Sequence, residues 1–268
     1  MLDSNEVRAL SWQNLLQSIR LQAKWAGPRA EWFDGPRLLM TCGACRLPLG
    51  TFNGAARLDA ALPADEFVDR ASRWFVQRKR GFSIYLNDEW DADVEQECAD
   101  RHFLALDDLG LFSIRPSDCS FSRSASGLEF ELVRNDHGVQ RFASVACESY
   151  GEVQALREQI AGTFLDSNLL LSPSLTLILA REAEEPVGAG LLLRSGRVGG
   201  IYWVGTVPQA RARGVASAVT QKLLETAGAL GLERVVLQAA PGVEKLYQRI
   251  GFEPMGRVRR FTWPFTHR

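Results

Sequence analysis

The segment of residues 206–218, TVPQARARGVASA, constrains the fold of this chain more than any other part of the sequence. It has the pattern of a strand end, a tight basic loop and the first turn of a helix. The loop contains Arg211 and Arg213, and the small residues Gly214 and Ala216 follow where the helix is expected to begin. The first N–H groups of a helix are unpaired and carry partial positive charge, and small residues let a bulky anion approach them. The segment therefore predicts a binding site for an anion such as a pyrophosphate.

The length and one polar stretch predict two domains. A chain of 268 residues suits two domains of about 120 to 140 residues each. Residues 121–127, FSRSASG, are small and polar and show no hydrophobic periodicity, which is typical of a linker. We therefore expect an N-terminal domain over residues 1–120 and a C-terminal domain over residues 128–268.

Hydrophobic periodicity predicts helices and strands in both halves. The helix expected over residues 63–78 begins with Pro63, and the one over 215–230 carries apolar residues at helical spacing. Other expected helices span 12–21, 91–102, 139–149 and 152–164, and one passes through Tyr247. Expected strands are 37–41, 51–58, 82–86, 128–133, 175–180, 187–193, 200–207 and 234–238, with a final strand pair within 252–263. This order predicts a mixed α/β (α+β) fold with a central sheet.

Composition excludes several classes of protein. The net charge of −1 argues against nucleic-acid binding, which usually requires a clearly basic face. No apolar run approaches the ~20 residues of a membrane-spanning helix, and the acidic first residues do not resemble a secretory signal. The five cysteines are an odd number scattered along the chain, which favours a reducing compartment. We therefore expect a cytoplasmic protein with no membrane partner and no nucleic-acid partner.

The CGAC motif at residues 42–45 is the one candidate for metal or redox chemistry. A zinc site needs four ligands, but the chain has no second CxxC motif and only three histidines, all distant in sequence. The residues before Cys42 have the pattern of a strand, whereas a thioredoxin-like motif opens a helix. We expect ordinary, partly buried thiols and no metal.

The second half of the chain resembles the GCN5-related N-acetyltransferase (GNAT) family, over roughly residues 128–265. Residues 211–216, RARGVA, fit the family's Q/R-x-x-G-x-G/A loop, and residues 204–208, VGTVP, match its splayed fourth strand. Residues 246–252, LYQRIGF, resemble its C-terminal L-Y-x-x-x-G-F signature. The competing phosphate loops fit less well, because a P-loop needs a Gly-Lys-Ser/Thr end and a dinucleotide fingerprint needs three glycines. A plain helix start with two solvated arginines is the remaining alternative, and it leaves the LYQRIGF motif unexplained.

The resemblance implies an N-acetyltransferase that uses acetyl-CoA, or another acyl-CoA, as acyl donor. Backbone amides of the loop and first helical turn would hold the pyrophosphate, backbone of the preceding strand would pair with the pantetheine amides, and Tyr247 would protonate the departing thiolate. The implied acceptor is a small-molecule amine or a protein amine, which attacks the thioester directly. The implied binding residues are Val204, Gly205, Thr206, Arg211, Ala212, Arg213, Gly214, Val215, Ala216 and Ser217.

Two departures from the family pattern keep a second function open. Ala240 stands where many relatives have an asparagine that contacts the pantetheine arm, and Pro241 and Gly242 follow it. The strand at 200–207 contains no carboxylate where many relatives keep a general base. A non-catalytic acyl-CoA-binding or regulatory module with the same fold is therefore the alternative.

The first half has a weaker similarity to the same fold. The segment at 52–57, FNGAAR, the helix at 63–78 and the strand at 82–86 resemble the degenerate N-terminal repeat of tandem GNAT proteins. Residues 86–90, LNDEW, are acidic where an anion site should be basic. This smaller lobe is expected to have lost cofactor binding.

Overall fold

The computed structural model describes residues 2–43, 46, 52–106, 108–120, 127–151 and 154–264. Helices and strands alternate through both halves, which confirms the expected mixed α/β order. The helices within the described residues are α1 Ser4–Trp25, α2 Ala64–Gln77, α3 Ala92–Asp100, α4 Asp136–Tyr150, α5 Gln154–Ala161, α6 Ser167–Leu170, α7 Val215–Ala229 and α8 Glu244–Ile250. The strands are β1 Glu31–Asp34, β2 Leu38–Cys42, β3 Gly54–Arg57, β4 Phe82–Leu86, β5 Leu104–Ala105, β6 Leu109–Ile114, β7 Leu128–Leu132, β8 Leu175–Glu182, β9 Glu185–Ser195, β10 Val198–Thr206, β11 Arg234–Ala239 and β12 Glu253–Trp263.

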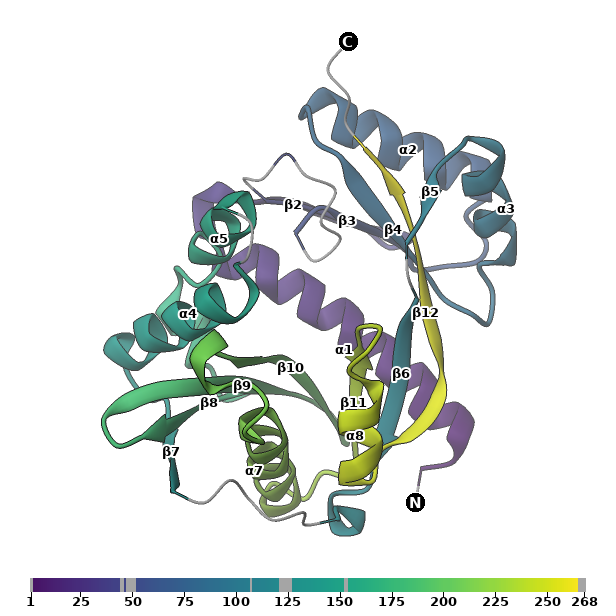
Figure 1. The fold of residues 1–268 in the computed structure, drawn as a ribbon. Coiled ribbons are helices and arrows are strands. Elements are labelled where there is room, and N and C mark those ends of the chain that lie inside the picture. Colours follow the sequence, from purple (N-terminus) through teal and green to yellow (C-terminus); the bar gives the residue numbers. More distant parts are fainter. Residues whose placement is uncertain are drawn as a thin grey trace.

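The two halves share one sheet in which each half contributes a strand to the other. The strand order is β1-β2-β3-β4-β12-β6-β11-β10-β9-β8-β7, with β5 beside β12 (Figure 1). From the first half, β6 pairs with β11, and from the end of the second half, β12 pairs with β4. The sheet therefore does not end at the expected boundary between the two domains. The sheet crosses the expected boundary between residues 120 and 128 because the last strand of each half pairs outside its own half.

The strand β12 joins the two parts of the sheet. It pairs with β6 up to Val258 and with β4 from Arg259 onward. The register against β6 shifts between Pro254 and Gly256, and Gly256 has φ 149°, a conformation that glycine tolerates. The expected final strand pair within 252–263 is instead one long strand, whose partners come from the first half.

The first half repeats the chain path of the second. The unit β3–α2–β4 has two parallel strands joined by a helix, as does β10–α7–β11, and these are the parallel strand pairs of the described sheet. The equivalent of the basic loop is therefore residues 58–63, before α2, and not the segment 86–90 that we expected. This turn contains Asp59, and the first turn of α2 contains Asp65 and Glu66. Negative charge at a helix N-terminus disfavours an anion there.

The helix α1 lies against both parts of the sheet and crosses the molecule diagonally (Figure 1). It begins with a capping box, in which the Asp3 side chain accepts from the Glu6 amide while the Glu6 side chain accepts from the Asp3 amide. The side chain of Asn14 donates to the Leu193 carbonyl on β9 at 3.1 Å. The helix therefore packs against strands from both halves of the chain.

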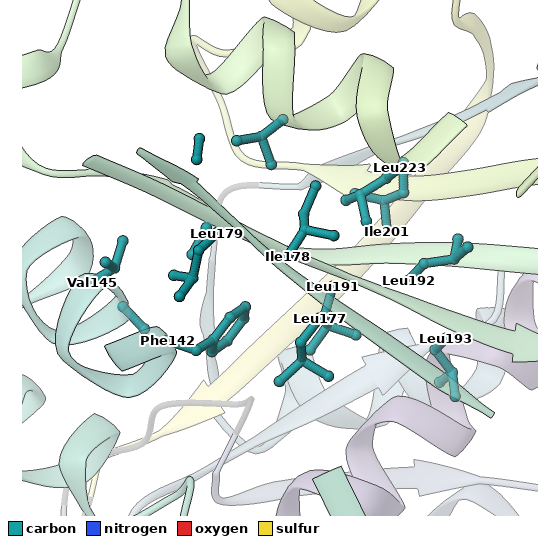
Figure 2. Close-up of a cluster of buried hydrophobic side chains, with 14 of the residues drawn as sticks. Phe142, Val145, Leu177, Ile178, Leu179, Leu191, Leu192, Leu193, Ile201 and Leu223 are labelled. Atoms are coloured by element: carbon teal, nitrogen blue, oxygen red, sulfur yellow. The ribbon is translucent and has the colours of Figure 1, made fainter. Parts of the chain in front are cut away.

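Hydrophobic packing in the core of the second half holds α7 against the sheet. Large aliphatic and aromatic side chains from α4, β8, β9, β10 and α7 meet there (Figure 2). The expected apolar face of α7, formed by Val215, Val219, Leu223 and Ala227, is buried. The approach is close, because a Cβ atom at Gly190 would lie 2.6 Å from Val219 Cγ1. The start of α7 is consequently held against β9, beside the end of β10.

Candidate functional site

The parallel pairing of β10 and β11 ends early, which opens the sheet between them. The two strands pair only over Val198–Gly200 and Arg234–Val236, and beyond that point β11 continues beside β6 while β10 continues beside β9. The register of β10 against β9 shifts between Tyr202 and Gly205, and Trp203 has φ 54°. Such backbone strain in a non-glycine residue is common at functional sites. The expected splay therefore exists, and it begins at residue 201, before the expected Val204.

The basic loop ends at an uncapped helix N-terminus. Gly214 is the N-cap of α7 in the left-handed conformation (φ 83°), with no side-chain cap and no acidic residue in the first turn. The first backbone hydrogen bond at this end of α7 is donated by the Ala218 amide to the Gly214 carbonyl, at 3.0 Å. The backbone N–H groups before Ala218 in this turn have no carbonyl of a preceding helical turn as hydrogen-bond acceptor. Residues 211–214 are exposed, so an anion can approach this turn.

The two arginines of the loop are engaged with protein groups. The Arg211 guanidinium donates to the Ser149 carbonyl, at the end of α4, at 2.9 Å. The Arg213 guanidinium forms an ion pair with Glu182 at the end of β8. Both members of that pair are substantially exposed, and such pairs contribute about 0.2–1 kcal/mol, whereas a charge-assisted bond to phosphate contributes about 1.5–3 kcal/mol. The Arg213 side chain is therefore held by a weak, exposed pair that an anion could replace.

The strand end at 204–206 is held from both sides. Gly205 and Thr206 pair with Ala189 and Gly188 of β9, and the Val204 carbonyl accepts a hydrogen bond from the Tyr150 hydroxyl. A Cβ atom at Gly205 would lie 2.7 Å from the Ser149 side chain, so this glycine lets the end of α4 approach β10. The Thr206 hydroxyl is buried and has no hydrogen-bond partner among the described residues. A ligand with amide groups along this edge fits such an unsatisfied group.

Tyr247 lies on α8 beside Tyr150. Its ring packs edge-on against Phe252, with ring centroids 5.8 Å apart, and burial raises the pKa of Tyr247 to about 12. Burial also raises the pKa of Tyr150, and the nearby Tyr247 adds to that shift. Both phenols therefore keep their protons at neutral pH. The next glycine, Gly251, ends α8 with φ 111°, which explains the glycine of the LYQRIGF motif.

A cavity of about 310 Å³ lies where β10 and β11 separate. Its walls come from both halves of the chain: the N-terminal half contributes Leu15, Ser18, Ile19, Gln22, Phe52, Tyr85 and Leu109, and the C-terminal half contributes Tyr150, Leu156, Ile160, Tyr202, Trp203, Gln238 and Arg260. None of these lining residues is Asp, Glu or His. Sequence reasoning did not identify the cavity or Tyr150, because neither belongs to a contiguous motif.

The cysteines and carboxylates form no recognisable metal centre in the described part of the chain. No group of three His, Cys, Asp or Glu side chains there could hold a metal ion. Cys42 lies on β2, and burial raises its pKa to about 11, whereas Cys45 lies outside the described residues.

Among the described helices, none has the length and hydrophobicity that a membrane-spanning segment requires.

Comparisons with known proteins agree with the fold. Residues 136–264 match the family model described as acetyltransferase (GNAT) domain. Among solved structures, a GCN5-related N-acetyltransferase from Kribbella flavida shares 16% identity over 93% of this chain and 95% of its own, with a TM-score of 0.68. A second, from Sphaerobacter thermophilus, shares 14% identity over 91% and 84%, with a TM-score of 0.63. A tandem GNAT protein from the clavulanic acid biosynthesis pathway shares 10% identity over 100% and 98%, with a TM-score of 0.58. Among curated proteins, no sequence matches the chain.

Proposed function

Because residues 136–264 form a GNAT acetyltransferase domain, we propose that the protein transfers an acetyl group from acetyl-CoA to a primary amine. The observation that carries the proposal is the uncapped N-terminus of α7 beside the opening between β10 and β11. The proposed anion site and the cavity thus both adjoin strand β10. A phosphate-binding loop alone occurs in many classes of protein. A loop next to a cavity suits an enzyme in which an acyl donor and an acyl acceptor bind side by side.

The proposed donor site follows the exposed edge of the loop and the strand. Acetyl-CoA supplies the acetyl group as a thioester. The turn formed by Ala212, Arg213, Gly214, Val215, Ala216 and Ser217 would hold its pyrophosphate through backbone amides, with Arg211 and Arg213 adding charge. Val204, Gly205 and Thr206 would align the pantetheine arm, and the unsatisfied Thr206 hydroxyl supports this path. The Val204 carbonyl already accepts a hydrogen bond from the Tyr150 hydroxyl, so it is less available to pair with a pantetheine amide.

In the proposed reaction, the amine nitrogen attacks the thioester carbonyl carbon, the C–S bond breaks, and the sulfur leaves as a thiolate. Tyr247 would donate its hydroxyl proton toward that sulfur. A phenol with a pKa of about 12 is a weaker acid than a thiol of pKa about 8.5, so complete proton transfer is uphill. Tyr247 therefore acts first by a hydrogen bond that stabilises the developing charge, as an oxyanion-hole donor does. The attacking amine gives up a proton, which balances the protonation of the thiolate.

No carboxylate or imidazole lines the cavity within the described residues, so the acceptor amine would enter in its neutral form. The lack of a base, together with Ala240, supports the alternative of a non-catalytic acyl-CoA-binding module. The cavity favours the transferase, because a module that only binds acyl-CoA has no need of a second site beside the thioester.

Isothermal titration calorimetry with acetyl-CoA tests the donor site. Gly214→Glu places a carboxylate at the N-terminus of α7, and we expect acetyl-CoA affinity to fall at least 100-fold, since a like charge faces the pyrophosphate. Gly231→Glu is the matched control, because Gly231 follows the other end of α7 with φ 70° and therefore imposes similar backbone strain. Equal affinity in both variants would remove the loop from the site. Release of free CoA thiol in the presence of primary amines then separates the transferase from the binding module.

A further inference from the structure

We infer that the acyl acceptor is a weakly basic aromatic amine, which binds in the cavity between the two halves and donates an N–H to Gln22 Oε1. The inference rests on the proposed function and adds the class of acceptor to it. The cavity adjoins the proposed reaction centre through Tyr150, which lines it and donates a hydrogen bond to the Val204 carbonyl. Tyr150 also lies beside Tyr247, the proposed proton donor.

The walls of the cavity favour an acceptor with an aromatic body. Among the aromatic side chains that line it, the Trp203 ring meets the Tyr150 ring edge-on at 5.6 Å and lies 6.3 Å from the Phe52 ring, between centroids. The Tyr202 hydroxyl donates to Asn14 Oδ1 at 2.7 Å, which holds another ring of the wall. A further aromatic ring can pack against such rings with favourable geometry. The volume of about 310 Å³ is at the lower end of the range for small-molecule sites and suits an amine with one or two rings.

A buried amide in the wall lacks a hydrogen-bond donor. The Gln22 side chain on α1 is 5% exposed, and its Nε2 donates to the Ser18 carbonyl at 3.2 Å. Because a carbonyl can only accept, this bond fixes the orientation of the amide. Gln22 Oε1 is then buried without a hydrogen-bond partner among the described residues. Buried polar atoms are normally satisfied, so a ligand that donates an N–H to this oxygen is favoured.

The charge of the wall distinguishes a weakly basic amine from an alkylamine. None of the described lining residues is Asp, Glu or His, so this part of the wall offers an ammonium group neither a counter-charge nor a base. An alkylamine resembles lysine, with a pKa of about 10.4, so only about one molecule in 2,500 is neutral at pH 7. Ring faces attract an ammonium group, but less strongly than burial of an unpaired charge disfavours it. In an aromatic amine the lone pair is delocalised into the ring, and the nitrogen is neutral at pH 7.

The remaining charged residue of the lining has no part in this assignment. Arg260 already interacts with another group of the protein, so it is not assigned to the ligand. The ligand is instead matched by an uncharged amide, Gln22, and by aromatic and aliphatic side chains.

The transfer is balanced with a neutral aromatic amine. The amine nitrogen forms a bond to the thioester carbonyl carbon, the C–S bond breaks, and the nitrogen loses one of its two protons while the CoA thiolate takes up one. The products are an N-aryl acetamide and CoA with a free thiol. The nitrogen becomes positively charged during the attack, and Gln22 Oε1 would then stabilise it by a charge-assisted hydrogen bond.

The test uses the full-length protein in complex with CoA, and pairs of isomeric amines that differ in whether the nitrogen is attached to the aromatic ring. The pairs are 4-methylaniline with benzylamine, and 5-aminoindane with 2-aminoindane. In calorimetry at pH 7, we expect the aromatic amine of each pair to have a Kd at least 10-fold lower than that of its isomer. An equal or higher Kd for the aromatic amines would overturn the inference. This comparison needs no variant, so it stands even if a substitution at Gln22 disturbs the fold.

Substitutions at Gln22 test its role. Gln22→Leu removes the amide oxygen, and the Kd of the aromatic amines should rise about 3- to 10-fold, as expected for the loss of one hydrogen bond. Gln22→Glu supplies a counter-charge and should shift the preference towards benzylamine and 2-aminoindane. Gln13→Leu is the matched control, because Gln13 is an exposed glutamine on the same helix. Acetyl-CoA affinity should be unchanged in all three variants, and equal effects of Gln22→Leu and Gln13→Leu would refute the role of Gln22.

The failure of the proposed function has a different signature. If no amine releases CoA thiol from acetyl-CoA, yet the aromatic amines bind more tightly than their isomers and Gln22→Leu weakens this binding, the cavity binds the inferred class of ligand without transfer. If amines are acetylated but the aromatic ones have no lower Kd, the transferase stands and the class of acceptor is wrong.

Discussion

The hydroxyl of Tyr150 donates a hydrogen bond to the carbonyl oxygen of Val204. This bond ties the last residue of α4 to the bulged part of β10, and the Tyr150 ring meets the Trp203 ring edge-on at 5.6 Å between centroids. Because its proton is directed to a backbone carbonyl, Tyr150 is unavailable as a donor to the thioester sulfur. Tyr247, which lies beside Tyr150, is therefore the better candidate for this donor.

Exchange of each tyrosine for phenylalanine separates their roles. Tyr247→Phe removes the proposed hydrogen bond to the leaving sulfur, and we expect kcat to fall about 10²- to 10⁴-fold with unchanged acetyl-CoA affinity. Tyr150→Phe removes the bond to Val204, and kcat should fall less than 10-fold. Turnover with each amine and calorimetry with acetyl-CoA measure both effects. The assignment fails if Tyr150→Phe is the more damaging change.

The raised pKa of Tyr247 predicts the pH dependence of the reaction. The donor stays protonated until the pH approaches about 12, and the acceptor amine reacts only when neutral. Activity should therefore rise with pH to a plateau, with no falling limb below about pH 10. A pH–rate profile of kcat checks this, and a falling limb centred near pH 8 would point to a different proton donor.

The buried phenols also predict an alkaline limit of stability. Burial raises the pKa values of Tyr150, Tyr202 and Tyr247 above the ordinary 10.0 of a phenol. Such groups ionise first in the unfolded chain, so they stabilise the fold below pH 10 and lose that contribution as the pH rises further. Phenolate absorbance should show at most one of the four tyrosines ionising near pH 10 in the folded protein. Parallel ionisation of three or four without unfolding would contradict the buried positions.

The shared sheet predicts that neither half folds alone. A fragment of residues 128–268 lacks β4 and β6. Residues Val235–Ala239 of β11 then have no partner on the β6 side, and β12 loses both strands that it pairs with. We expect this fragment to aggregate. By contrast, cleavage at a protease site introduced within residues 121–126 should leave both pieces associated in native size-exclusion chromatography. A soluble 128–268 fragment with full acetyl-CoA affinity would show that the strand exchange is dispensable.

A buried ion cluster holds the first half together. The Arg57 guanidinium contacts Asp91 at 2.8 Å and Asp93 at 2.6 Å, and the Arg57 and Asp91 side chains are each 1% exposed. Removing one partner of a buried pair costs about 3–5 kcal/mol, because the other charge stays buried. Arg57→Ala should lower the free energy of unfolding by this amount in urea titrations. Arg37→Ala, which breaks an exposed pair with Asp59, should cost less than about 1 kcal/mol, and equal losses would refute the role of burial.

The sequence by itself determined the features whose physics is local. The start of α7 at Val215, after the basic loop, was predicted because a helix N-terminus depends only on adjacent residues. The splay of β10, the apolar face of α7 and the place of Tyr247 on α8 were also predicted, within one or a few residues. The chemical roles of these residues remain predictions.

Only the tertiary structure decided which edges pair and which side chains meet. Strand β6 was not predicted, since LGLFSI is short and its partners lie more than a hundred residues away in β11 and β12. The edge of a strand can satisfy its backbone hydrogen bonds with any extended neighbour, so the exchange depends on the geometry of the assembled halves rather than on local pattern. Tyr150 reaches Val204 because α4 packs on β10 within the second half. Arg260 reaches the cavity because the exchange pairs β12 with β4 of the first half.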